Sequence, residues 1–238
     1  MSLLQTTLNT RDLGGKKTKT GLITIPNRIY RSYYNNNIPP NQNDINFLLK
    51  NNINTIIDIR TIQEKNANKN YFESLKNFKY YNYPIEEGSQ IPKTKEDVSK
   101  SYMDIACSKN IKNILEKIAI AENGVLFHCS AGKDRTGVIT AIIYMLCDVL
   151  ENEIINDYMI SKENLKIKFE EIKNKIPNID LNIIIPQKSY IIDFMKMFHD
   201  KFGNANKYMD FIGLDSYYRI KIKNKMLKEW LMKCLYKE

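Results

Sequence analysis

Cysteine and histidine are scarce in this chain, which has four cysteines and two histidines among 238 residues. The cysteines, at positions 107, 129, 147 and 234, include no closely spaced pair, so neither a disulfide scaffold nor a zinc site is indicated. This usage fits a reducing compartment. Because His128 and His199 are the only histidines, a histidine-rich metal centre is not indicated either, and we expect no metal and no cofactor.

Long hydrophobic runs are also missing. No apolar run approaches the roughly 18 residues of a membrane-spanning helix, so none is predicted. The segment Met1 to Gly15 has no apolar core, which argues against a standard signal peptide. We take the cytoplasm as the default location and keep export without such a signal as the alternative.

Arginine is the third scarce residue, with 6 arginines against 30 lysines. The formal net charge of +9 would suit an anionic partner, but the chain also has 35 isoleucines and 28 asparagines, the skew that an AT-rich genome produces. Nucleic-acid binders usually depend on arginine, whose planar fork fits phosphates and base edges. We therefore expect no nucleic-acid partner, and the lysine-rich segment 221–233 is interpreted as a solvated face, with docking on a membrane surface as the alternative.

What remains is an ordinary globular composition, with 43% hydrophobic and 26% charged residues and no repeat or linker. We therefore predict one domain over residues 1–238. The pattern predicts strands at 55–60, 79–83 and 125–127, helices at 41–52, 111–123, 138–146, 190–202 and 217–235, and a polar loop at 86–98. Strands that alternate with helices, followed by a helical tail, indicate an α/β fold with a mainly parallel central sheet flanked by helices.

The stretch from His128 to Gly137 reads His-Cys-Ser-Ala-Gly-Lys-Asp-Arg-Thr-Gly and lies between an apolar strand and an apolar helix. A loop that enters a helix N-terminus points several backbone N–H groups inward, and the helix dipole adds partial positive charge. Three small residues allow the loop to close around a tetrahedral anion: Ser130, Ala131 and Gly132. Arg135 can grip two phosphate oxygens, and the same field favours the thiolate form of Cys129. The stretch therefore predicts a phosphate site with a cysteine nucleophile.

This loop resembles the Cys-x5-Arg loop of the protein tyrosine phosphatase superfamily. Its full form is similar to that of a bacterial group related to the mycobacterial secreted phosphatase B and the listerial lipid phosphatases. Three further landmarks of that group precede the loop in the sequence, in the same order as in the group. They are Asn9–Gly15, where Thr10 replaces the usual Phe, Tyr30–Ser32 and Ile57–Arg60. The resemblance implies a tyrosine-phosphatase-like fold. Because a Gly-Gly pair follows closely, Arg11 and Asp12 are expected to be structural, in a tight turn packed near the loop.

Roles follow from the resemblance, residue by residue. Cys129 would be the nucleophile, forming a phosphocysteine that water hydrolyses, and Arg135 would clamp the phosphate. The Thr136 hydroxyl is expected to bond the thiolate, and His128 to orient the loop. Lys133 resembles an extra loop lysine of phosphoinositide phosphatases, where a second cation helps to hold polyanionic head groups.

The general acid is less well defined by the sequence. Asp134 in the loop is the first candidate, and Glu86, where related proteins carry an acidic residue, is the second. Asp58 at the end of a predicted strand is third, and Asp104 follows. Asp58 and Arg60 are also open to a second interpretation, as an internal ion pair that supports the site.

The main hypothesis is a cysteine-dependent phosphatase that acts on phosphotyrosine, with phosphoserine and phosphothreonine as further substrates. A phosphoinositide phosphatase is the alternative, and a catalytically silent phospho-binding module is the third possibility. The partner would accordingly be a phosphorylated protein or a phosphoinositide. The oligomeric state, and whether the segment after residue 160 forms a helical lid over the site as in some relatives, are not decided by the sequence.

Overall fold

The structure, a computed structural model, describes residues 2–34 and 38–227. At its centre is a five-stranded sheet with the strand order β1-β2-β5-β3-β4. The strands are β1 (Arg11–Asp12), β2 (Ile29–Tyr33), β3 (Ile53–Asp58), β4 (Lys79–Asn82) and β5 (Gly124–Cys129). Strands β2, β5, β3 and β4 run parallel, and the short edge strand β1 pairs antiparallel with β2. The predicted α/β class with a mainly parallel sheet is confirmed.

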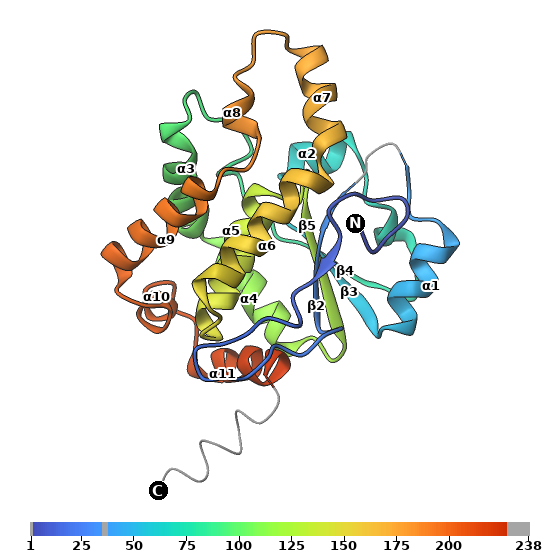
Figure 1. Cartoon of the computed structure of the whole chain (residues 1–238). Helices are drawn as coiled ribbons and strands as arrows, with labels where there is room; N and C mark the ends of the chain where they lie inside the picture. Colours follow the sequence, from blue (N-terminus) through green and yellow to red (C-terminus); the bar gives the residue numbers. More distant parts are fainter. Residues whose placement is uncertain (1, 35–37, 228–238) are drawn as a thin grey trace, which may run out of the picture.

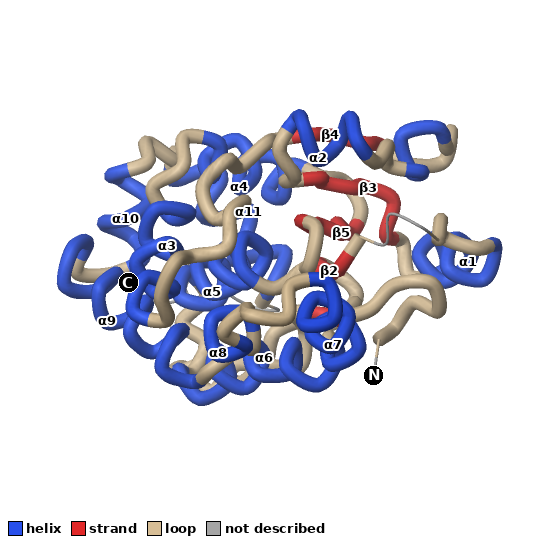
Figure 2. The backbone as a smooth tube through the Cα atoms, turned by 90° about the horizontal axis from the view of Figure 1, so that it is seen from above, coloured by secondary structure: helices blue, strands red, loops and turns tan. Residues whose placement is uncertain are grey.

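Helices cover both faces of the sheet. Seen from above, α1 lies on one side of the strands, and α3, α4 and α5 lie on the other (Figure 2). Their bounds are α1 Gln42–Lys50, α2 Ile62–Ala67, η1 Tyr71–Ser74, α3 Glu96–Ala106, α4 Asn110–Ile120, α5 Asp134–Leu146, α6 Glu151–Asn164, α7 Lys166–Lys175, α8 Leu181–Ile184, α9 Lys188–Phe202, α10 Ala205–Phe211 and α11 Ser216–Met226. Helices α7 and α8 form the projecting top of the molecule (Figure 1).

The central strand β5 shows why the chain folds in this way. Its side chains alternate between the two faces, so Val125 and Phe127 join the core under α3–α5, whereas Leu126 joins the core under α1. A strand that is buried on both faces needs apolar residues at every position, as in a parallel sheet. The carboxyl end of β5 carries Cys129, so the sheet delivers this residue to the edge where ligands of parallel sheets collect.

Two helices differ from the expectations, and a third expectation falls partly outside the described residues. Helix α2 lies in a segment for which no helix was predicted, because it is short and buries no residue. Helix α3 begins inside the stretch expected to be a loop at 86–98; its polar sequence hides the helically spaced Val98, Tyr102 and Ile105, which are buried. The helix expected at 217–235 is present as α11, and residues 228–235 lie outside the described part of the chain.

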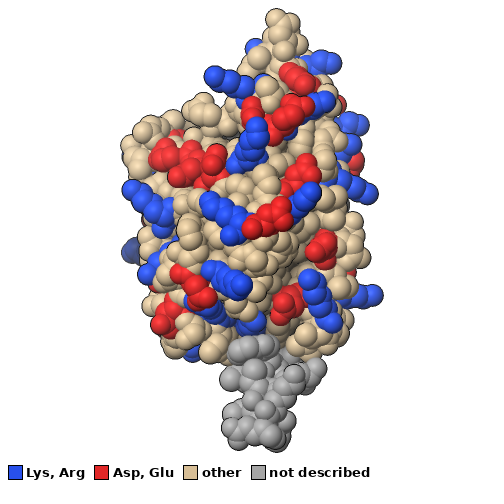
Figure 3. All heavy atoms as spheres, turned by 90° about the vertical axis from the view of Figure 1, so that its left-hand side faces the viewer, with Lys and Arg blue, Asp and Glu red and all other residues tan. Residues whose placement is uncertain are grey.

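The surface carries both signs of charge. On the face shown in Figure 3, lysine and arginine side chains are interspersed with aspartate and glutamate. Although the net charge of the chain is +9, the basic side chains on that face do not form one continuous patch. Among the described residues, no helix is both long and apolar enough to cross a membrane.

Candidate active site

The loop between β5 and α5 closes tightly on the sulfur of Cys129, which is buried. The Gly132 N–H donates a hydrogen bond to Cys129 Sγ at 3.2 Å. At the base of the loop, the Cys129 N–H donates to Thr136 Oγ1 at 3.0 Å. Gly132 has φ +62°, and a Cβ there would stand 2.2 Å from the carbonyl oxygen of Ser32. The loop conformation therefore requires glycine at this position.

The guanidinium group of Arg135 is held by the carboxylate of Glu64, which belongs to helix α2. Its Nη1 and Nη2 donate to the two carboxylate oxygens of Glu64, each at 2.7 Å, and Nη1 also donates to the carbonyl of Ile85 at 3.2 Å. The Ser130 hydroxyl donates to the same carboxylate at 2.6 Å. Burial alone would raise the pKa of Glu64, but the hydrogen bonds from Arg135 and Ser130 and the charge of Arg135 outweigh it and lower the pKa to about 2. Glu64 is thus ionised and sets the orientation of the guanidinium group.

The carbonyl group of Gly132 in the loop accepts hydrogen bonds from two distant segments of the chain. Gly132 O accepts from Asn9 Nδ2 at 2.9 Å and from Arg31 Nη2 at 2.8 Å. Arg31 and Arg11 share Asp157, at 2.6 and 2.9 Å, so two cations and one anion lie buried under the loop. With its carbonyl held by these donors, Gly132 has its N–H on the Cys129 sulfur. Arg11 is buried and connects to the loop through Asn9 and Asp157, and its structural role stays a prediction.

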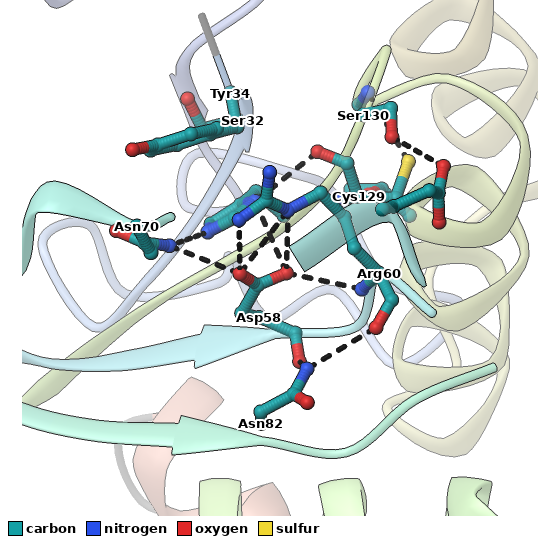
Figure 4. Close-up of polar contacts among 12 residues, drawn as sticks. Ser32, Tyr34, Asp58, Arg60, Asn70, Asn82, Cys129 and Ser130 are labelled. Atoms are coloured by element: carbon teal, nitrogen blue, oxygen red, sulfur yellow. Dashed lines mark hydrogen bonds and ion pairs between the residues drawn. The ribbon is translucent and has the colours of Figure 1, made fainter. Parts of the chain in front are cut away.

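A second buried network supports the other side of the loop (Figure 4). Asp58 accepts from Arg60 Nη2 at 2.7 Å and from Asn70 Nδ2 at 3.1 Å, and Asn70 also donates to His128 Nε2 at 2.8 Å. Since that nitrogen accepts, Nδ1 carries the proton and donates to the carbonyl of Cys129 at 3.1 Å. Burial lowers the pKa of His128, which keeps the imidazole neutral. The ring of Tyr34 stacks on His128, at 5.0 Å between centroids, and fixes its plane.

In the Asp58–Arg60 pair, burial acts against the charge of both partners. The pKa of Asp58 is nevertheless lowered, because its electrostatic interaction with the nearby His128 ring and the hydrogen bonds and charge of Arg60 outweigh burial. Both side chains are fully buried and bonded to each other. The arrangement therefore matches the ion-pair interpretation, with Asp58 occupied as an acceptor instead of facing a substrate.

These elements border a pocket of about 310 Å³ at the carboxyl end of β5. Cys129, Asp134 and Arg135 line it together with Glu64. Its remaining wall is largely aromatic and aliphatic, and includes Tyr33, Tyr34, Ile91, Pro92, Val98, Leu165, Phe169, Ile172, Ile183 and Ile184. The last five come from the α7–α8 region and its approach, so the segment after residue 160 forms part of the pocket wall.

The acid candidates separate clearly in space. Asp134, the first residue of α5, lines the pocket, and its Oδ1 accepts from the Tyr102 hydroxyl at 2.6 Å. Glu86 is exposed and does not line the pocket, and the same holds for Asp104 on α3. Of the four candidates, only Asp134 reaches the cavity that contains the cysteine.

Lys133 does not extend into the pocket as a free cation. Its side chain is buried, and Nζ donates to the carbonyl of Ile184 in α8 while lying 5.9 Å from the centre of the Phe169 ring. It also lies 3.4 Å from Asp134 Oδ1. In this structure, the loop lysine therefore connects the loop to the pocket wall.

Sequence reasoning missed Glu64, Asn9, Asp157 and Tyr102 as parts of the site. One of them has a signal in the sequence: Thr61-x-x-Glu64 has the spacing of a capping box, and both of its hydrogen bonds are present at the start of α2. The others depend on contacts between distant segments. Within the described ranges, no group of three or more His, Cys, Asp or Glu side chains is placed to hold a metal ion.

A buried cysteine at the end of a central parallel strand, a glycine-dependent loop and an oriented arginine form a site in which a thiol, backbone N–H groups and a cation lie together. A sequence model described as the tyrosine phosphatase family matches residues 3–228, so the chain belongs to that family.

The matches to individual relatives are either short or low in sequence identity. A stretch of 56 residues is 45% identical to a tyrosine-protein phosphatase from Nostoc commune, and it covers 23% of this chain and 19% of that protein. Among solved structures, the core catalytic domain of the PP-IP phosphatase SIW14 from S. cerevisiae is 19% identical, with 87% of this chain and 97% of that chain covered and a TM-score of 0.41. TpbA from P. aeruginosa, in complex with pTyr, is 15% identical over 58% of this chain and 71% of that chain, with a TM-score of 0.36. The family assignment rests on the sequence model.

Proposed function

We propose that this protein hydrolyses phosphotyrosine in proteins, and more slowly phosphoserine and phosphothreonine, through a phosphocysteine intermediate. The observation that carries the proposal is the meeting of Cys129, Arg135 and Asp134 in one pocket, with the sulfur at the bottom of the loop. A nucleophile, an anion clamp and a proton donor are the groups that phosphate ester hydrolysis requires.

The steps follow from these positions. The Cys129 thiolate attacks phosphorus and forms a P–S bond while the P–O bond to the tyrosine oxygen breaks, and Asp134 gives its proton to that oxygen. Water then attacks phosphorus, Asp134 accepts its proton, and the P–S bond breaks to release inorganic phosphate and the thiolate. Throughout, the backbone N–H groups and Arg135 stabilise the negative charge on the other phosphate oxygens.

The pocket wall favours an aromatic ester over a polyanionic head group. Beyond the loop, the substrate would meet mainly aliphatic and aromatic side chains, among them Phe169 and Ile91, which suit a tyrosine ring. The two lysines that could hold further phosphates are both engaged: Lys133 with the Ile184 carbonyl, and Lys168 with Glu171 at 2.7 Å.

The mechanism is tested by hydrolysis of p-nitrophenyl phosphate in the presence of EDTA, with the variants Cys129→Ser and Cys107→Ser. Cys107 is an exposed thiol outside the pocket and serves as the matched control. We expect full activity with EDTA, full activity of Cys107→Ser and none of Cys129→Ser. Activity retained by Cys129→Ser would refute the mechanism, and tight binding of a phosphopeptide without turnover by the native protein would identify a binding module instead.

The substrate preference has its own test. We expect kcat/KM to be higher for a phosphotyrosine peptide than for a phosphoinositide in mixed micelles. Phe169→Ala, which opens the apolar wall, is expected to lower kcat/KM for the peptide. Faster turnover of the phosphoinositide would support the lipid phosphatase alternative.

A further inference from the structure

Two buried tyrosines stand behind Asp134, and the reaction steps above do not use them. Tyr102 on α3 and Tyr158 on α6 are 1% and 2% exposed. The Tyr102 hydroxyl is 2.6 Å from Asp134 Oδ1 and 2.7 Å from the Tyr158 hydroxyl. This series of hydrogen bonds therefore connects the helices α6, α3 and α5, and it ends on the carboxyl group of Asp134 at the pocket.

The direction of the hydrogen bonds follows from the number of protons. Tyr102 has one hydroxyl proton, and it points to Asp134 because a carboxylate oxygen can only accept. The bond between the two tyrosines must then be donated by Tyr158 to the oxygen of Tyr102. Burial raises the pKa of both tyrosines, so both stay protonated and the direction of the chain does not change over the ordinary pH range.

This direction decides which oxygen of Asp134 exchanges a proton. Oδ1 already accepts a hydrogen bond from Tyr102 and lies 3.4 Å from the Lys133 ammonium group, so it is occupied by donors. A proton on the carboxyl group must therefore sit on Oδ2. The carboxyl group is thereby oriented with one oxygen toward the protein and the other available to the pocket that Asp134 lines.

We propose that Tyr102, held by Tyr158, is a positioning residue that fixes the rotamer of Asp134 and directs proton transfer to Oδ2. The inference rests on the proposed function, in which Asp134 is the general acid. Tyr102 does not touch the reacting atoms and acts through Asp134 alone. Its contribution should therefore appear only where the leaving group needs a proton.

The test compares a substrate with a good leaving group, p-nitrophenyl phosphate, and one with a poor leaving group, phenyl phosphate. General acid catalysis contributes about 10²–10⁴-fold, and a misplaced acid is expected to lose part of it. For Tyr102→Phe we expect kcat on phenyl phosphate to fall about tenfold and kcat on p-nitrophenyl phosphate to fall less than about threefold, with little change in KM. Tyr158→Phe should act in the same direction and more weakly, and it replaces Tyr102→Phe if that variant does not fold.

Tyr208→Phe is the matched control, because its hydroxyl is equally buried but donates to the carbonyl of Ala106. A structural role alone would lower both rates equally, in Tyr102→Phe as in Tyr208→Phe, and this result would overturn the inference. Asp134→Asn distinguishes the role of Asp134 as the general acid from the role of Tyr102 in positioning it. If it lowers the phenyl phosphate rate selectively and Tyr102→Phe does not, the inference fails while the acid assignment stands. If Asp134→Asn lowers both rates equally, the acid assignment and the inference fail together, whereas the role of Cys129 is still judged by its own variant.

Discussion

Replacement of Glu64 by Gln should destabilise the fold in a way that depends on pH. The carboxylate receives both Nη groups of Arg135 and the hydroxyl of Ser130, and its side chain is 28% exposed. A pKa lowered from 4.5 to about 2 corresponds to about 3 kcal/mol of stability at neutral pH, at about 1.4 kcal/mol per pKa unit. We expect Glu64→Gln to lower the free energy of unfolding by about 2–3 kcal/mol at pH 7, because glutamine keeps the shape and loses the charge.

The sign of the pH dependence follows from the lowered pKa. The folded protein holds Glu64 ionised to lower pH than the unfolded chain does, so the stabilisation is complete above about 4.5 and is lost as pH falls toward about 2. The gap between native protein and Glu64→Gln should therefore shrink by about 1 kcal/mol between pH 6 and pH 3.5. Urea unfolding followed by circular dichroism at both pH values measures this gap.

Glu122→Gln is the matched control. Its ion pair with Lys79 is as short, at 2.8 Å, but both side chains are largely exposed. Exposed pairs contribute little, so this variant should unfold like the native protein at both pH values. A gap for Glu64→Gln that is absent at pH 7, or that stays constant down to pH 3.5, would refute the reasoning that the buried pair with Arg135 holds the carboxylate ionised.

Two further predictions concern the loop. Gly132→Ala should lower the free energy of unfolding by at least about 2 kcal/mol and abolish hydrolysis of p-nitrophenyl phosphate, because the new Cβ would meet Ser32 O; thermal unfolding and an initial-rate assay check this. Gly15→Ala, with a similar φ and no atom within 4 Å of the new Cβ, controls for backbone strain alone, and equal effects in the two variants would contradict the prediction. Asn9→Asp should reduce kcat/KM about tenfold or more, since a carboxylate beside the Gly132 carbonyl replaces a donor by an acceptor. Asn164→Asp, whose native side chain donates a long hydrogen bond of 3.4 Å to the Asn9 amide oxygen, should change kcat/KM far less. An active Asn9→Asp would argue against a role of Asn9 in shaping the loop.

The loop at His128–Gly137 was predictable from the sequence because the interactions that shape it are local. Ten consecutive residues, His128 to Gly137, contain the sulfur, the small residues that allow the turn and the arginine one helical turn further on. Strand patterns are equally local: β3 and β5 are largely apolar and buried, and the alternation in β4 stops at a proline, so all three strands were expected close to where they lie. The ordered landmarks around Asn9, Arg31 and Asp58 indicated which segments surround the loop, but not which atoms they contact.

Contacts between distant segments were decided by the tertiary structure alone. Because β5 lies between β2 and β3, the start of α2 comes to the loop, and Glu64 meets Arg135 across 71 residues of sequence. The same packing places Asp134 in the pocket and Glu86 on the surface, and it directs Lys133 to the Ile184 carbonyl. Sequence periodicity reports how each element buries its own face, and it contains no information about which side chains meet when the elements assemble. The sequence by itself therefore determined three parallel strands of the sheet and the loop at His128–Gly137, whereas the orientation of Arg135 and the placement of Asp134 depended on the order of the strands and the packing of α2, α3 and α8.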